Sequence, residues 1–166
     1  MAEKKADLMF RMDGAPLMYR NFAGRKTQFN REGDRNFCID LTGEDVDQLV
    51  ADGWNVKWTK PRDDDEYEQR PFLPVAIKYN FKPPRIVLVT SRKQTNLTEE
   101  MLEVLDFAEI TNVDIIVRGW HWVTGEGTEF EKHGVKAEVK TMYITIFEDE
   151  LEMKYSEGAP PIGSEE

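Results

Sequence analysis

The sequence predicts a single all-β domain with one or two short helices, and three observations lead to this class. Apolar and polar residues alternate in short runs along the chain, which is the period of a half-buried strand. Turn-forming residues separate these runs at short intervals. The 166 residues, 40% of them hydrophobic and 11% aromatic, are enough for one domain with a sizeable core. We therefore expect a barrel or a sandwich of β-strands.

The first half of the chain has the pattern of four strands and one helix. The strands are expected at residues 17–22, 36–41, 54–59 and 75–82. A polar, glycine-bounded basic loop is expected over residues 24–35, and an acidic surface loop over residues 62–70. Thr42 and Asp45 suit the start of a short helix, because either side chain can accept a hydrogen bond from the first turn. Gly53 suits the end of that helix.

The second half of the chain is dominated by a hairpin signal. Pro83 and Pro84 break the preceding strand, and residues 85–90 are continuously apolar, as in a strand buried on both faces. Residues 91–98 form a polar loop, and residues 99–105 fit either a helix or a strand. The strongest hairpin in the chain follows, with strands at residues 113–124 and 135–147 joined by a turn at residues 125–127.

The acidic residues are segregated along the chain. We expect a flexible N-terminus over residues 1–8, a folded domain over residues 9–150, and an acidic disordered tail over residues 151–166. The net charge is −10, but residues 148–166 alone carry a net −6 and residues 62–70 a net −3. The remainder is nearly neutral, so the overall acidity does not exclude nucleic acid as a partner.

Several classes of protein are disfavoured by what the sequence lacks. Cys38 is the only cysteine, which prevents an intramolecular disulfide and suits a reducing compartment. No apolar run approaches the ~20 residues that span a bilayer, so a cytoplasmic protein without membrane contact is expected. There is no phosphate-binding loop, and His121 and His133 lack metal-ligand spacing. We expect no enzymatic activity, no catalytic residue, no metal site and no cofactor.

One face of strand 113–124 carries the clearest functional pattern. Arg118, Trp120 and Trp122 lie on the same face of the expected strand. A cation beside two indoles is what a stacking platform for unpaired nucleic-acid bases requires. The alternative is that one or both tryptophans belong to the core, because tryptophan is often mostly buried.

Three further elements combine cations with aromatic or polar residues. They are residues 78–85, the loop over residues 20–31, and the loop over residues 91–96. Each could also be an ordinary solvated surface, and their joint occurrence is the better argument for nucleic acid. The expected phosphate contacts are Arg25, Lys26, Lys78, Lys82, Arg85, Arg92, Lys93 and Arg118.

The aromatic residues supply the candidates for base stacking. Some of them must be core residues, and because Trp54 and Trp58 share a face with Val56, we expect at least one of those two inside. The stacking candidates are Phe22, Trp54, Trp58, Tyr79, Trp120 and Trp122.

Several segments resemble single-stranded DNA-binding proteins encoded by tailed bacteriophages. They are residues 21–25, 36–39, 53–58, 83–87 and 112–118. The resemblance implies an OB-fold-like five-stranded Greek-key barrel, here with extra strands, over the domain at residues 9–150. It also implies a role in DNA replication and recombination inside the bacterial host cell.

Taken together, these patterns predict sequence-independent binding of single-stranded DNA through aromatic stacking and Lys/Arg contacts to phosphates. The acidic tail would rest on the DNA-binding groove when it is empty, or recruit replication or recombination proteins. The oligomeric state is left open, a homodimer included. The alternative is a non-enzymatic phage protein–protein interaction module that uses the same Trp/Tyr surface against a partner.

Overall fold

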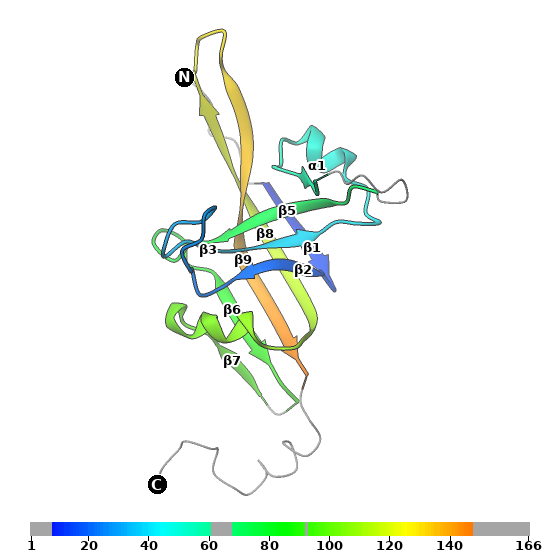
Figure 1. Cartoon of the computed structure of the whole chain (residues 1–166), viewed down its shortest axis with the longest axis vertical. Helices are drawn as coiled ribbons and strands as arrows, with labels where there is room; N and C mark the ends of the chain where they lie inside the picture. Colours follow the sequence, from blue (N-terminus) through cyan, green and yellow to red (C-terminus); the bar gives the residue numbers. More distant parts are fainter. Residues whose placement is uncertain (1–7, 61–67, 92, 148–166) are drawn as a thin grey trace, which may run out of the picture.

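The computed structural model describes residues 8–60, 68–91 and 93–147, which form an all-β fold with two short helices (Figure 1). The predicted class is therefore confirmed. The expected acidic tail at residues 151–166 and all but Leu8 of the expected N-terminal segment lie outside the described residues. The elements are β1 (Leu8–Asp13), β2 (Leu17–Asn21), β3 (Arg35–Asp40), α1 (Asp47–Ala51), β4 (Lys57–Trp58), β5 (Pro71–Ile77), β6 (Arg85–Val89), β7 (Gln94–Asn96), the 3₁₀ helix η1 (Glu99–Asp106), β8 (Ile110–Thr124) and β9 (Lys132–Ile146).

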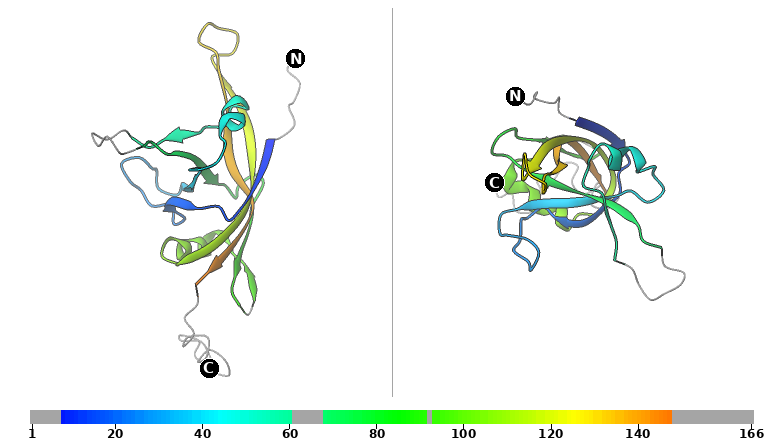
Figure 2. Two further views of the ribbon diagram at one scale, coloured as in Figure 1. Left: turned by 90° about the vertical axis from the view of Figure 1, so that its right-hand side faces the viewer. Right: turned by 90° about the horizontal axis from the view of Figure 1, so that it is seen from above.

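The strands belong to one mixed sheet that curves round a common interior (Figure 2). Its main path runs β1-β8-β9-β5-β3-β2, with β4 added beside β5, and β6 and β7 added beside β9. The two ends of this path, β1 and β2, follow each other in sequence across a short turn. Both β5 and β6 pair parallel to β9, at Ala76↔Glu138 and from Arg85↔Thr141 onward. The loop over residues 78–84 therefore separates two segments that lie along the same strand.

The core fills the concave side of this sheet because each strand buries alternate residues. In β5, Leu73, Val75 and Ile77 are buried, while the residues between them are half-buried. Phe22 and Phe37 stack face to face in the interior, with ring centroids 5.3 Å apart. No helix of the described residues is long and apolar enough to cross a membrane.

Four sequence-based element assignments are corrected by the structure. The strand expected at 75–82 begins earlier, at Pro71, and ends at Ile77. It ends there because pairing with β9 stops after Ala76 and resumes only with Arg85 in β6. The strand expected at 54–59 is reduced to the two residues of β4. Residues 94–96, expected in a loop, form β7 against β6. Residues 8–13, for which no strand was expected, form β1 because they pair with β8.

The predicted hairpin is confirmed as two 15-residue strands, β8 and β9. Its outer part, from residue 120 to residue 136, extends beyond the rest of the sheet and is called here the hairpin arm (Figure 1). The Trp122 ring lies across its cross-strand partner Gly134, where a Cβ atom would overlap the indole. This cover of a strand glycine by an aromatic ring stabilises an otherwise marginal two-stranded ribbon.

Candidate nucleic-acid interface

A groove with a volume of about 1130 Å³ lies over the face of β3 and β5 that points away from the core. Half-buried Cys38, Phe72 and Pro74 lie along these two strands, between buried neighbours. Further residues come from β2, from the loop between β2 and β3, from the segment at residues 57–60, and from Phe107 after η1. The groove therefore has a floor formed by the sheet and walls formed by loops.

Aromatic rings line this groove at several points. Tyr19 is 61% exposed and Trp58 is 51% exposed, so both present most of a ring face or edge to solvent. Tyr19 packs edge-to-face against Phe72, with ring centroids 5.5 Å apart. The exposed Phe29 and Phe107 also line the groove. Several exposed rings gathered in one groove are typical of an interaction site, whereas single exposed rings are common on protein surfaces.

Tyr19 has a backbone conformation that is unusual for its residue type. Its φ angle is +53°, the one positive φ among the described non-glycine residues. The pairing of β2 with β3 is irregular between Met18 and Asn21, which is where this residue lies. A left-handed conformation costs an L-residue about 1–2 kcal/mol. The irregularity allows Tyr19 to line the groove, at a cost that the rest of the fold offsets.

Cations outnumber anions along the groove. Arg25, Lys57 and Lys60 line it without an ion pair to any described residue. Arg70 also lines it, with its Nη1 atom 3.5 Å from Asp40 Oδ2. Burial by itself would raise the pKa of Asp40, but hydrogen bonds from Thr42 and the charge of Arg70 lower it overall. The carboxylate therefore stays ionised beside Arg70.

The one acidic residue among the lining residues holds the wall of the groove in place. The Asp106 carboxylate accepts hydrogen bonds from the backbone N–H groups of Phe22, at 2.7 Å, and Ala23, at 3.0 Å. Arg35 also fixes this segment, because its Nη1 donates to the Phe22 carbonyl at 2.7 Å and its Nε to Glu99 at 3.2 Å. These contacts tie the start of the basic loop to η1.

Arg25 is positioned by its neighbours at the edge of the groove. Its backbone N–H donates to the Asn21 side chain at 2.8 Å, and its carbonyl accepts from the same side chain at 3.1 Å. Its guanidinium carbon lies 4.9 Å from the centroid of the Phe107 ring. The pair places a charge and an aromatic face together, as required for simultaneous phosphate and base contacts.

Cys38 lies on the floor of the groove. Burial raises the pKa of its thiol to about 11, and the nearby charge of Lys57 offsets only part of this effect. The thiol is therefore neutral at physiological pH and acts as a small apolar surface.

Two of the residues expected to stack on bases are instead core residues. Phe22 is fully buried against Phe37, and Trp54 is buried against Phe10 and beside Gly119. Neither ring has a face available to a ligand, so we remove both from the interface. The expectation that at least one of Trp54 and Trp58 lies inside is confirmed, since Trp54 is the buried member.

The expected face of β8 forms, but apart from the groove. Arg118, Trp120 and Trp122 do share one face, yet none of them lines the groove. Trp120 is occupied by protein contacts, with Lys82 Nζ 5.0 Å from its ring centroid and the Phe81 ring 6.1 Å away. Its indole N–H donates to Glu138 at 3.1 Å. Trp120 is thus a packed residue, whereas Trp122 remains 43% exposed.

The other expected contacts are distributed over separate surfaces. Lys78 lies 3.6 Å from Asp34, and Tyr79 is half-buried, with burial raising the pKa of its phenol. Arg85 lies over Tyr143, with 5.7 Å from its guanidinium carbon to the ring centroid. The remaining three are Lys26, exposed beside Arg25, Lys93, exposed in the loop after β6, and Arg92, which lies outside the described residues.

Sequence reasoning missed several groove residues. Tyr19 and Lys57 lie within strands that were expected, but neither was selected as a contact. Phe72 lies between Pro71 and Pro74, and the prolines concealed the strand that carries it. Phe107 and Lys60 had no local pattern that could have identified them. The available signal was that Tyr19, Trp58 and Phe72 are aromatic residues that each lie in a short β-segment.

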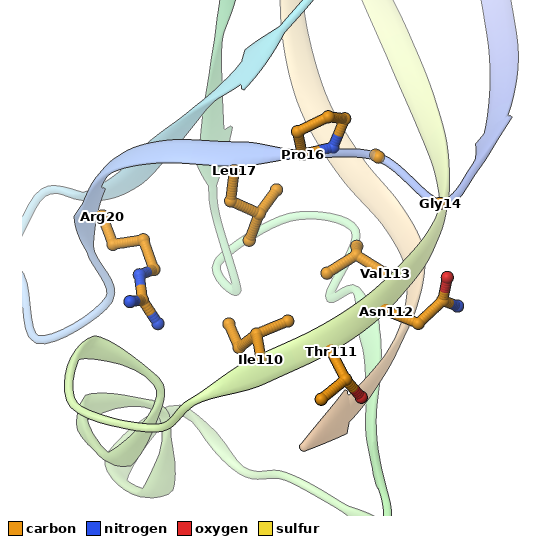
Figure 3. Close-up of a pocket in the computed structure, with 9 residues that line it drawn as sticks. Gly14, Pro16, Leu17, Arg20, Ile110, Thr111, Asn112 and Val113 are labelled. Atoms are coloured by element: carbon orange, nitrogen blue, oxygen red, sulfur yellow. The ribbon is translucent and has the colours of Figure 1, made fainter. Parts of the chain in front are cut away.

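A smaller pocket of about 320 Å³ lies between the β1–β2 turn and the start of β8 (Figure 3). Leu17, Ile110 and Val113 lie round it in this view. Arg20 is its one lining cation, and Arg20 Nη1 already donates to the carbonyls of Leu105 and Ala108. This pocket lacks the exposed rings of the larger groove, which is therefore the better candidate for a nucleic-acid site.

Exposed rings and cations in one groove are typical of a protein that binds nucleic acid, and comparisons with known proteins agree with this class. The model of the phage ssDNA-binding domain family matches residues 2–163, so the chain belongs to this family. The family identified from the sequence is thereby confirmed. Among solved structures, a C-terminal truncation of the single-stranded DNA-binding protein from bacteriophage Enc34 has a similar fold, with a TM-score of 0.50 at 9% identity. The match covers 85% of this chain and 87% of that one. No curated protein matches the sequence.

Proposed function

We propose that the chain binds single-stranded DNA in the groove over β3 and β5. Tyr19, Trp58 and Phe72 offer rings for bases, and Arg25, Lys57 and Lys60 beside them contact phosphates. The observation that carries this proposal is the presence of exposed aromatic rings and cations in one groove. Stacking contributes about 1–3 kcal/mol per base and tolerates any sequence, because every base has a π-face. Family membership supports the class of ligand.

The strand pairing supports the same location. Taken as one bent strand, β1 and β2 pair with β8 at one end and with β3 at the other, and β5, β8 and β9 complete a set of five. This is the connectivity we assign to an OB-fold, with β4, β6 and β7 as additions. OB-folds bind nucleic acid on the face of their second and third strands, between flanking loops. In this assignment those strands are β3 and β5, which carry the groove.

The cations outside the groove act as secondary contacts. Lys82 and Arg118 lie near Trp120, and Lys26 lies next to Arg25. Exposed cations around a binding groove attract a polyanion and guide its path without reading its sequence. Lys78, Arg85 and Lys93 lie on other surfaces and add to the positive potential without lining the groove.

The chain performs no catalysis in this proposal. It covers single strands exposed during phage DNA replication or recombination, in the cytoplasm of the host cell. Its acidic tail competes with DNA for the groove, and when DNA displaces it, the tail is free for replication or recombination proteins. The support for this tail function is charge alone. Residues 148–166 carry a net −6, and the charged residues that line the groove are mostly cations.

Titration with oligo-dT tests the proposal directly. DNA should quench tryptophan fluorescence, because Trp58 lies in the groove. Trp58→Ala should weaken binding by about 5-fold to 150-fold, which corresponds to the loss of one stacked base. Trp122→Ala is the matched control and should leave the affinity unchanged, because Trp122 lies outside the groove.

The possible failures of this experiment have distinct meanings. The absence of both a quench and a gel shift at low salt, with the full chain and with a tail-less one, would refute DNA binding. An equal loss of affinity in the Trp58 and Trp122 variants would refute the groove as its location.

A further inference from the structure

In the part of the chain that the structure describes, the hairpin arm has an open edge along β8. Strand β1 pairs with β8 only as far as Leu8↔Gly119. Beyond this point residues 120–124 pair with β9 on one side, from Trp120↔Lys136 to Thr124↔Lys132. Their other side has no strand partner among the residues that the structure describes. Such an edge is a template for pairing with another strand.

The residues that direct backbone groups to this edge can be identified. The Val113 carbonyl accepts a hydrogen bond from Ala15, so it points to the β1 side of β8. Backbone groups along a strand alternate between its two sides, and the β8 residues after 112 are paired without an extra residue in β8. His121 and Val123 therefore point their N–H and C=O groups to the open edge.

The two edges of the arm are protected unequally. Proteins usually protect a free edge with charged side chains, above all lysine, or with proline. The β9 side has Lys132 and Lys136, whereas residues 120–124 of β8 contain neither a lysine, an acidic residue nor a proline. Exposed apolar groups accompany this unprotected edge, since Trp122 is 43% exposed and Val123 is 38% exposed.

We propose that a second copy of this chain pairs with the β8 edge, antiparallel and about a two-fold axis at Trp122. Each His121 would then lie opposite Val123 of the second copy, and the two pairs would form four backbone hydrogen bonds. Trp122 would face its own counterpart in a non-hydrogen-bonded pair, with Cα atoms about 4.5 Å apart. The two arms would become one four-stranded sheet, with the same surface on both copies.

The charges of the arm favour this occupant. Its tip carries Glu126, Glu129 and Glu131, whereas Arg118 and Lys136 lie near its base. An antiparallel pairing places the tip of each arm at the base of the other, with Arg118 opposite Glu126 of the second copy. A phosphate backbone along the same edge would instead meet the three acidic side chains at the tip. None of the groove-lining residues belongs to the arm, so pairing and DNA binding can coexist.

Disulfide trapping tests the register. In a Cys38→Ser background, we would make His121→Cys in one batch and Val123→Cys in a second, differently tagged batch. Only their mixture should form a covalent dimer under mild oxidation, because these Cα atoms lie about 5.5 Å apart when paired. Each variant alone places its own cysteines about 9 Å apart, too far for a disulfide. A mixture that cross-links no faster than either variant alone would overturn the proposal.

Sedimentation equilibrium of the unaltered full chain keeps the proposal testable if the cysteine variants fail to fold. The average molecular mass should rise from that of a monomer toward that of a dimer as the protein concentration increases. Glu126→Lys should raise the dissociation constant by about 2-fold to 30-fold, because symmetry repeats the altered pair twice. Adding Arg118→Glu to the same chain should restore it. A chain that stays monomeric at the cross-linking concentration, or that cross-links only after removal of residues 1–7, would overturn the proposal and leave that of DNA binding intact.

Discussion

Replacing Lys57 with alanine tests the electrostatic half of the DNA-binding proposal. Lys57 lies exposed on β4, opposite Phe72, and with Arg25 and Lys60 it is one of three groove cations without an ion pair to a described residue. Each phosphate contact contributes about −0.7 to the slope of log affinity against log salt for single strands, so three give about −2. Between 50 and 200 mM salt, the affinity of the unaltered chain should fall roughly 20-fold.

The variant changes this slope by a defined amount. Lys57→Ala should bring it to about −1.4, so that the same rise in salt costs about 7-fold in affinity. The assay is fluorescence anisotropy of labelled oligo-dT at several salt concentrations, with thermal unfolding as a check of the fold. Lys132→Ala is the control, because Lys132 is also exposed but neither lines the groove nor belongs to the proposed DNA contacts. An unchanged slope for Lys57→Ala, or an equal change for Lys132→Ala, would refute the assignment of the groove cations.

Three further predictions concern the loop, the thiol and the tail. Asp106→Ala should lower the free energy of unfolding by about 1–3 kcal/mol in urea, because two backbone N–H groups lose their acceptor; an unchanged midpoint would show that this carboxylate does not hold the loop. Since burial raises the pKa of Cys38 to about 11, its alkylation in the folded chain should keep accelerating from pH 8 to pH 10, as the thiolate fraction grows, and single-stranded DNA should slow it. The urea-unfolded thiol, whose pKa is about 8.5, should instead level off by about pH 10, and the same levelling-off in the folded chain would contradict this. Deleting residues 148–166 should tighten DNA binding at low salt by removing a net −6, and an unchanged affinity would disprove competition by the tail.

The sequence predicted local features of the fold better than it predicted where distant segments meet. The alternation in β8 and β9 was sufficient to predict the hairpin, because both strands are long and one face of each is buried. Strand β5 was misplaced because Pro71 and Pro74 discourage a strand assignment, although both residues lie in the ladder with β4 and β3. Strand β7 was missed because its three residues are stabilised by pairing with β6 and have no strand pattern of their own.

The candidate site shows the same limit. Residue type and alternation correctly placed Arg118, Trp120 and Trp122 on one face of β8, but could not show that Lys82 and Phe81 would cover Trp120. Tyr19 and Phe72 lie 53 residues apart in sequence and touch only because β2 and β5 both pair with β3. A groove built from such contacts is a property of the sheet, so no single segment of the sequence contains it.

The left-handed backbone at Tyr19 sets the stability of the fold against the affinity for DNA at one position. Glycine adopts such a conformation without steric cost, so Tyr19→Gly relieves the backbone there while it removes a ring from the groove. A search for heat-resistant variants would tend to discard this tyrosine, whereas a search for tight DNA binding would keep it. Position 19 is thus a place where the tyrosine itself, retained against its conformational preference, would record selection for binding among relatives of this chain.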